Sequence, residues 1–169
     1  MSVSDRAQVT AAALVERLRR DGLVLATAES LSGGLVAAGV TAVPGASDVF
    51  RGGIVAYATD SKRDVLGVPP DVLRAHGPVA GETAQAMAEA VCRLFGTDLG
   101  IATTGVAGPD PVGGLPPGVV YVAAALADGP TRVARPACTG DRAAIRDCAV
   151  HAALEAGLAL LDSGNPPRE

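Results

Sequence analysis

The only lysine in the chain, Lys62, is the first residue whose type suggests chemistry. The chain has 169 residues with thirteen arginines, and a composition rich in Ala, Gly and Pro suggests coding pressure that replaces lysine wherever arginine will serve. Lysine can lose its proton inside a folded site, whereas arginine effectively never does. Lys62 is therefore either a surface residue present by chance or a residue that functions by losing its proton. The residues around it must distinguish these two interpretations.

Once the other common catalytic arrangements are excluded, nucleophilic catalysis by a serine and a lysine remains. The G-x-S-x-G motif of α/β hydrolases is absent, and the two histidines, His76 and His151, do not suit a catalytic triad. Ser47 precedes a predicted strand that ends at Tyr57, and Lys62 lies one turn into the helix that follows. We therefore favour Ser47 as nucleophile, with Tyr57 on the proton path. Lys62 would be a base whose pKa is lowered from about 10.4.

Two loops of small residues could hold a ligand. The loop Glu29–Gly34 supplies two hydroxyls and two glycines where a helix begins, a place suited to a phosphate or a carboxylate. There Ser30 would anchor substrate or stabilise an oxyanion, and it stays open as an alternative nucleophile; the loop could equally be only a helix cap. A second loop, Gly105–Asp110, lacks the G-x-G-x-x-G spacing of a dinucleotide site. The candidate binding residues in and beside these loops are Ser32, Gly33, Gly34, Thr104, Gly105, Ala107 and Gly108.

Composition excludes several classes of protein. A net charge of −4, no basic stripe and few aromatic residues argue against nucleic acid as a partner. The longest apolar run, Val119–Ala127, falls well short of the ~20 residues of a membrane helix, and the first ten residues do not read as a secretory signal. Cys92, Cys138 and Cys148 are too widely spaced for a disulfide framework or a metal site. We expect a reduced, cytoplasmic protein that uses no metal and no cofactor.

Alternating periodicities predict an α/β protein. Helices are expected over 9–20, 35–43, 82–95 and 141–161 with short turns near 59–66 and 71–75, and strands over 23–28, 52–57, 99–104, 119–127 and 131–138. This order predicts a three-layer α/β/α sandwich whose mixed, mostly parallel sheet carries one antiparallel strand. Residues 1–162 are expected to form a single domain and residues 163–169 a disordered tail. Ligands in such sheets bind beyond the carboxyl ends of the strands.

Several sequence blocks together resemble the carboxy-terminal domain of the CinA (competence/damage-inducible) family. They occur in the family's order and cover the chain from about residue 9 to 161. The blocks are Thr27–Gly34, Gly45–Gly53, Tyr57–Lys62, Leu66–Val68, His76–Val79, Thr104–Asp110 and Gly140–Arg142.

The resemblance implies a metal-independent amidase that converts nicotinamide mononucleotide to nicotinate mononucleotide and ammonia in bacterial pyridine-nucleotide recycling. The family's catalytic positions correspond to Ser30, Ser47, Tyr57 and Lys62, with Arg142 on the substrate. The expected partner is this small mononucleotide, with no nucleic acid and no membrane, and the protein is expected to be a homo-oligomer, either a dimer or a trimer. The alternative is a nucleotide-binding module of the same fold with weak or no turnover, because residues 115–119 depart from the family's Lys-Pro-Val-Gly-Thr segment.

Overall fold

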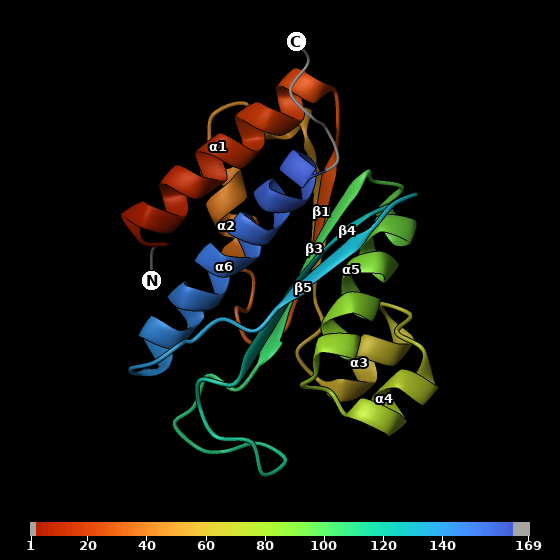
Figure 1. Cartoon of the computed structure of the whole chain (residues 1–169), viewed down its shortest axis with the longest axis vertical. Helices are drawn as coiled ribbons and strands as arrows, with labels where there is room; N and C mark the ends of the chain where they lie inside the picture. The colour runs from red at the N-terminus through yellow and green to blue at the C-terminus, as the bar shows by residue number, and fades with distance from the viewer. Residues whose placement is uncertain (1–2, 164–169) are drawn as a thin grey trace.

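The computed structural model describes residues 3–163, and its five strands form one mixed sheet in the order β2-β1-β3-β4-β5 (Figure 1). Strand β1 (Leu25–Glu29) lies between β2 (Phe50–Val55) and β3 (Leu99–Gly105) and is parallel to both. Strand β4 (Val120–Leu126) is antiparallel to β3, and β5 (Thr131–Ala134) is antiparallel to β4. Only β4 opposes the other strands of this sheet, so the predicted mixed, mostly parallel sheet is confirmed.

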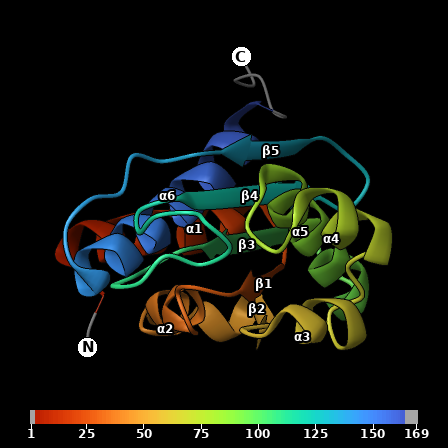
Figure 2. The same ribbon diagram turned by 90° about the horizontal axis from the view of Figure 1, so that it is seen from below.

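Helices cover both faces of the sheet, which gives the predicted three layers (Figures 1 and 2). One face carries α1 (Asp5–Asp21), α2 (Leu35–Thr41) and α6 (Arg142–Ser163), and the other carries α3 (Thr59–Asp64), α4 (Pro70–His76) and α5 (Gly81–Phe95). None of the helices in the described part of the chain has the length and apolarity needed to cross a membrane.

Small side chains let the layers pack closely around the two central strands. Every residue of β1 is buried, with Leu25 facing the α1 and α6 layer and Ala26 facing α5. A Cβ atom at Gly100 of β3 would lie 2.2 Å from the carbonyl oxygen of Ala88, so α5 rests directly on the strand backbone. An alanine- and glycine-rich core therefore replaces the aromatic side chains that the sequence almost lacks.

The structure differs from the expected elements mainly near the end of the chain. Strand β5 ends at Ala134, four residues before the predicted end, because Pro136 has no N–H to continue the ladder. Asp141 caps α6, its Oδ1 accepting a hydrogen bond from the Ala144 N–H at 2.8 Å. Ser163 is the last residue of α6 rather than part of a tail, and residues 164–169 lie outside the described residues.

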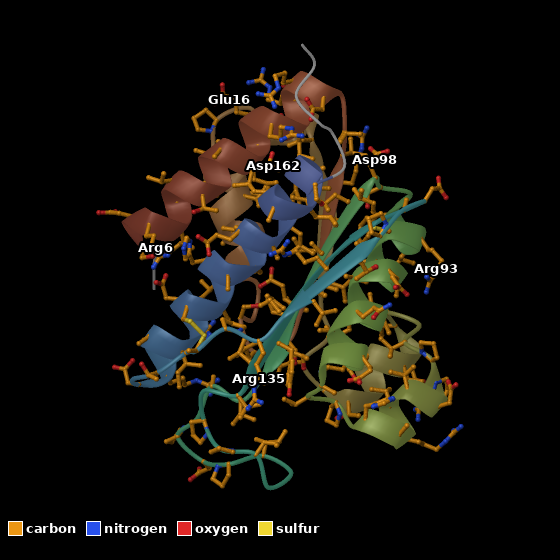
Figure 3. The ribbon with its side chains drawn as sticks, viewed as in Figure 1. Arg6, Glu16, Arg93, Asp98, Arg135 and Asp162 are labelled. Carbon is orange, nitrogen blue, oxygen red and sulfur yellow. A yellow bond between two sulfur atoms is a disulfide. The ribbon has the colours of Figure 1, made fainter. Side chains whose placement is uncertain are left out.

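Cys138 and Cys148 form a disulfide, contrary to the expectation from their spacing. The segment after β5 folds back along the first two turns of α6, which brings the two Cα atoms within 5.7 Å, inside the usual range for a disulfide. The bond lies at the lower end of α6 in Figure 3, where yellow marks the two sulfur atoms. Cys92 is free and buried in the core.

Candidate active site

Lys62 is the one buried residue of the short helix α3, which follows β2 at the carboxyl edge of the sheet. Its side chain is 2% exposed, and its Nζ donates hydrogen bonds of 2.9 Å to the Oγ of Ser30 and to the carbonyl oxygen of Ala56. Burial lowers the pKa of Lys62 from 10.5 to about 8, and among residues 3–163 no carboxylate forms a salt bridge with the amine. About a tenth of the amine is then neutral at pH 7, so it can act as a base.

Ser30 stands at the end of β1, held by backbone bonds on both sides. Its N–H donates to the Thr103 carbonyl oxygen at 3.0 Å, and its own carbonyl accepts from the Gly33 N–H at 3.0 Å. The residue is 7% exposed and lines the cavity described below. The serine hydroxyl and the lysine amine are thus a preorganised pair, positioned by the carboxyl ends of two neighbouring parallel strands.

Ser47 does not belong to this pair, although the sequence favoured it as the nucleophile. It is exposed in the short helix η1 (Ala46–Asp48), which precedes β2, whereas Lys62 follows that strand. The register pairs Phe50 at the start of β2 with Leu25 at the start of β1, so Ser47 lies at the amino edge. The six residues of β2 separate the two edges by nearly 20 Å. A serine at that edge cannot exchange a proton with Lys62 of the same chain.

The amino end of α2 binds a carboxylate, but the carboxylate belongs to the protein itself. Glu29 is 1% exposed, and its oxygens accept hydrogen bonds from the N–H groups of Gly34, Val36 and Ala37 at 2.8–3.0 Å. The Ser32 hydroxyl donates to the same carboxylate at 2.7 Å. The donors expected to hold a substrate anion are therefore already satisfied, because the last residue of β1 reaches over them.

A cavity of about 220 Å³ lies over the Ser30–Lys62 pair. The predicted residues that line it are Ser30, Tyr57, Lys62, Gly105, Ala107, Gly108 and Arg142. Ser32, Gly33, Gly34 and Thr104 are not part of its wall. Thr104 instead donates to the Pro78 carbonyl oxygen at 2.6 Å, and so fixes the segment that forms the opposite side of the cavity.

Arg142, in the first turn of α6, closes the rim of this cavity. Its Nη2 donates to the Tyr57 hydroxyl at 2.8 Å and its Nη1 to the Gly108 carbonyl oxygen at 2.6 Å. Tyr57 is 56% exposed, so its ring stands at the mouth rather than beside the Lys62 amine. A guanidinium has five N–H donors, so these two hydrogen bonds do not use all of them.

Sequence reasoning missed a second arginine that supports the site. Arg146 follows Arg142 by one helical turn, and its guanidinium donates to the carbonyl oxygens of Leu31 at 3.1 Å and Ser32 at 2.7 Å. These bonds hold the loop that carries Ser30 against α6. The spacing of four residues is visible in the sequence and places both arginines on one helix face. Glu29 was missed as well, since nothing in its type reveals that its partner is the next helix.

Fold and site together define an α/β protein with a buried serine–lysine pair at the carboxyl edge of its sheet. Comparison with known families is consistent with this architecture. The model of the CinA C-terminal domain matches residues 7–161, and the chain therefore belongs to the CinA C-terminal domain family.

Relatives of known sequence carry the same family name. A CinA-like protein from Myxococcus xanthus (strain DK1622) is 49% identical over 148 residues, which are 86% of this chain and 35% of that protein. A CinA-like protein from Frankia casuarinae is 50% identical over 132 residues, which are 78% of this chain and 30% of that protein. The chain thus spans about a third of the length of these relatives.

Solved structures of similar proteins share the whole fold. The competence/damage inducible protein CihA from Agrobacterium tumefaciens superposes with a TM-score of 0.89 at 32% identity, covering 95% of this chain and 98% of that one. A CinA superfamily protein from Klebsiella pneumoniae 700603 gives a TM-score of 0.88 at 31% identity, covering 93% and 98%. The α/β fold is therefore that of the CinA superfamily.

Proposed function

We propose that this chain is a metal-independent amidase that hydrolyses nicotinamide mononucleotide to nicotinate mononucleotide and ammonia, as the family resemblance implies. The observation that carries the proposal is the hydrogen bond of 2.9 Å between the Lys62 amine and the Ser30 hydroxyl, both of which line the cavity. A lysine whose pKa lies near 8 activates a serine at physiological pH without histidine.

In the proposed reaction the Ser30 Oγ attacks the carboxamide carbon while neutral Lys62 takes the hydroxyl proton. The tetrahedral intermediate then breaks its C–N bond, and Lys62 returns that proton to the departing ammonia. This leaves an ester on Ser30. A water molecule that gives a proton to Lys62 attacks the ester carbon and releases the carboxylate, and the amine returns the proton to Ser30. Among residues 3–163 no group of His, Cys, Asp and Glu side chains is arranged to hold a metal, and none of these steps uses one.

The size of the cavity assigns the parts of the substrate in this proposal. At about 220 Å³ it is smaller than the ~300–1,000 Å³ of typical ligand pockets, so it accommodates a pyridine carboxamide rather than a whole mononucleotide. The ribose and phosphate would then extend to the mouth, where Tyr57 and Arg142 stand. We propose that the free donors of Arg142 bind the phosphate, in place of the α2 amino end that Glu29 occupies.

The purified protein is expected to release ammonia and nicotinate mononucleotide in equal amounts from nicotinamide mononucleotide. Nicotinamide and glutamine serve as control substrates, because neither offers Arg142 a phosphate, and both should react far more slowly. Binding of the mononucleotide without ammonia release would contradict the amidase proposal and leave the nucleotide-binding module as the function. Equal rates on all three amides would contradict the assignment of the phosphate to the mouth.

A further inference from the structure

The disulfide between Cys138 and Cys148 encloses the part of the chain that carries both supporting arginines. Its two cysteines are ten residues apart, and Arg142 and Arg146 lie between them. Arg142 holds Tyr57 and the Gly108 carbonyl oxygen, while Arg146 holds the loop after Ser30. A covalent bond thus closes around a stretch of α6 that contacts the other walls of the cavity.

The segment from residue 135 to 140 depends on this bond for much of its attachment to α6. Arg135 begins it with its guanidinium 5.6 Å from the ring centre of Tyr121, at the end of the sheet near the 105–118 loop (Figure 3). Within the described residues, 135–140 make one backbone–backbone hydrogen bond, from the Cys138 N–H to the Pro136 carbonyl oxygen at 3.1 Å. The chain is otherwise irregular there, so the disulfide is its strongest link to the helix.

The two cysteines differ in exposure, which suits thiol–disulfide exchange with an external reagent. Cys138 is 5% exposed, and its carbonyl oxygen packs against Gly118, where a Cβ would lie 2.4 Å away. Cys148 is partly exposed on α6, so it is the more accessible of the two cysteines. Cys92 offers a contrast, because burial raises the pKa of its thiol to about 11 and keeps it protonated and unreactive.

We propose that Cys138 and Cys148 are a redox modification site whose state sets the position of Arg142 and Arg146. The oxidant is a low-molecular-weight disulfide. The Cys148 thiolate attacks it, forming a mixed disulfide and releasing one thiol, and Cys138 then displaces the second thiol as the internal S–S bond forms. Two protein thiols are oxidised and one external disulfide is reduced to two thiols. The oxidised form holds the first two turns of α6 on the cavity, and the reduced form releases them.

The effect of reduction on substrate binding depends on which groups lie between Cys138 and Cys148. Ser30 and Lys62 stand on other elements, and Ser30 is also held from outside the segment by the bond from its N–H to the Thr103 carbonyl oxygen at 3.0 Å. Their hydrogen bond should therefore persist when the Arg146 bonds to the neighbouring loop are released. Arg142 stands at the mouth and loses its fixed place when the segment is released. Reduction should therefore weaken substrate binding more than it slows the chemical step, an expectation that rests on the proposed amidase function.

Hydrogen exchange followed by mass spectrometry tests the structural part without any substrate. The wild-type protein is incubated with oxidised glutathione or with dithiothreitol and then exchanged. The oxidised form should be lighter by two hydrogens in mass analysis under denaturing conditions. Amides in residues 139–147 should exchange at least about tenfold faster after reduction, while those of β1 and β3 stay unchanged.

Three variants make the test specific. Cys138→Ser/Cys148→Ser should exchange like the reduced wild type and ignore the reductant, and Cys92→Ser should respond as the wild type does. The KM for nicotinamide mononucleotide should rise about tenfold on reduction, which corresponds to ~1.4 kcal/mol, with kcat changed less than about threefold. In Arg142→Ala this response of KM should largely disappear.

The possible outcomes test the redox site, the amidase proposal and the role of Arg142 separately. Equal exchange in the two redox states, or failure of oxidised glutathione to form the bond, would overturn the redox site. Redox-dependent exchange in a protein that releases no ammonia would support the redox site while the amidase proposal fails. An equal KM response in Arg142→Ala and wild type would overturn the link through that arginine.

Discussion

The Ser30→Ala variant is expected to lose at least about a thousandfold in kcat for nicotinamide mononucleotide, whereas Ser47→Ala should retain nearly full activity. Ser30 Oγ is the only side-chain hydroxyl within hydrogen-bond distance of the Lys62 amine among the described residues. Ser47 is exposed at the opposite edge of the sheet. Ser47→Ala is the control variant, because both replacements remove a single serine hydroxyl.

Initial rates of ammonia release, with thermal unfolding of both variants as a check on folding, provide the measurement. Loss of activity in Ser47→Ala with retention in Ser30→Ala would reverse the assignment of the nucleophile. Such a result would require Ser47 to reach the cavity of another copy of the chain, since within one chain the length of β2 separates it from Lys62.

Lys62→Met is expected to abolish activity and, at pH 7, to raise the free energy of unfolding by about 1–2 kcal/mol. Burial lowers the pKa of Lys62 from 10.5 to about 8, a shift that corresponds to about 3 kcal/mol of cost for burying the charged amine. Methionine fills similar space without that charge, but it leaves the Ala56 carbonyl oxygen and the Ser30 hydroxyl without their donor. The net gain is therefore smaller than the full cost.

The pH dependence of this difference identifies its source. Below pH 8 the amine is protonated in both the folded and the unfolded chain, so the cost is fully present. Between about pH 8 and 10.5 the folded chain loses the proton while the unfolded chain keeps it, and the wild-type protein gains stability as pH rises. Urea unfolding of wild type and Lys62→Met at pH 7 and at pH 10 should show the advantage of the variant shrinking. A variant less stable at both pH values by the same amount would mean that Lys62 is not buried as a charge.

Much of the fold was predictable because its elements have clear periodicity. Helix α5 and strands β1 and β3 carry the apolar patterns of buried elements, and glycines or prolines separate them. The end of β5 was overestimated, since the apolar pattern continues past Ala134 while Pro136 removes the ladder donor. Periodicity reports burial, and it does not report where hydrogen bonding stops.

The candidate site was predictable in its lysine and only partly in its serine. Lys62 stands out by composition alone. Ser30 follows a strand and Ser47 precedes one, and in a parallel sheet this difference places them at opposite edges. The distinction was available in the sequence once the strands were assigned, but the setting of Ser30 at the amino end of a helix suggested an anchor for substrate or oxyanion, which favoured Ser47.

Other features depend on distances that a sequence does not contain. Glu29 satisfies the amino end of α2 because the chain turns back over its own strand within a few residues. Cys138 and Cys148 meet because the segment after β5 lies along α6. Neither pairing has a local pattern, so each becomes visible only when the elements are packed.

The pH dependence of kcat/KM for nicotinamide mononucleotide tests the central claim, that neutral Lys62 activates Ser30, most directly. The wild-type value should rise about tenfold per pH unit at low pH and level off above an apparent pKa near 8, since only the unprotonated amine accepts the serine proton. Lys62→Arg, which keeps the charge and cannot lose it, should show no activity at any pH in the same range. A wild-type profile that is flat from about pH 6 to 9, or an arginine variant that retains turnover, would contradict the account.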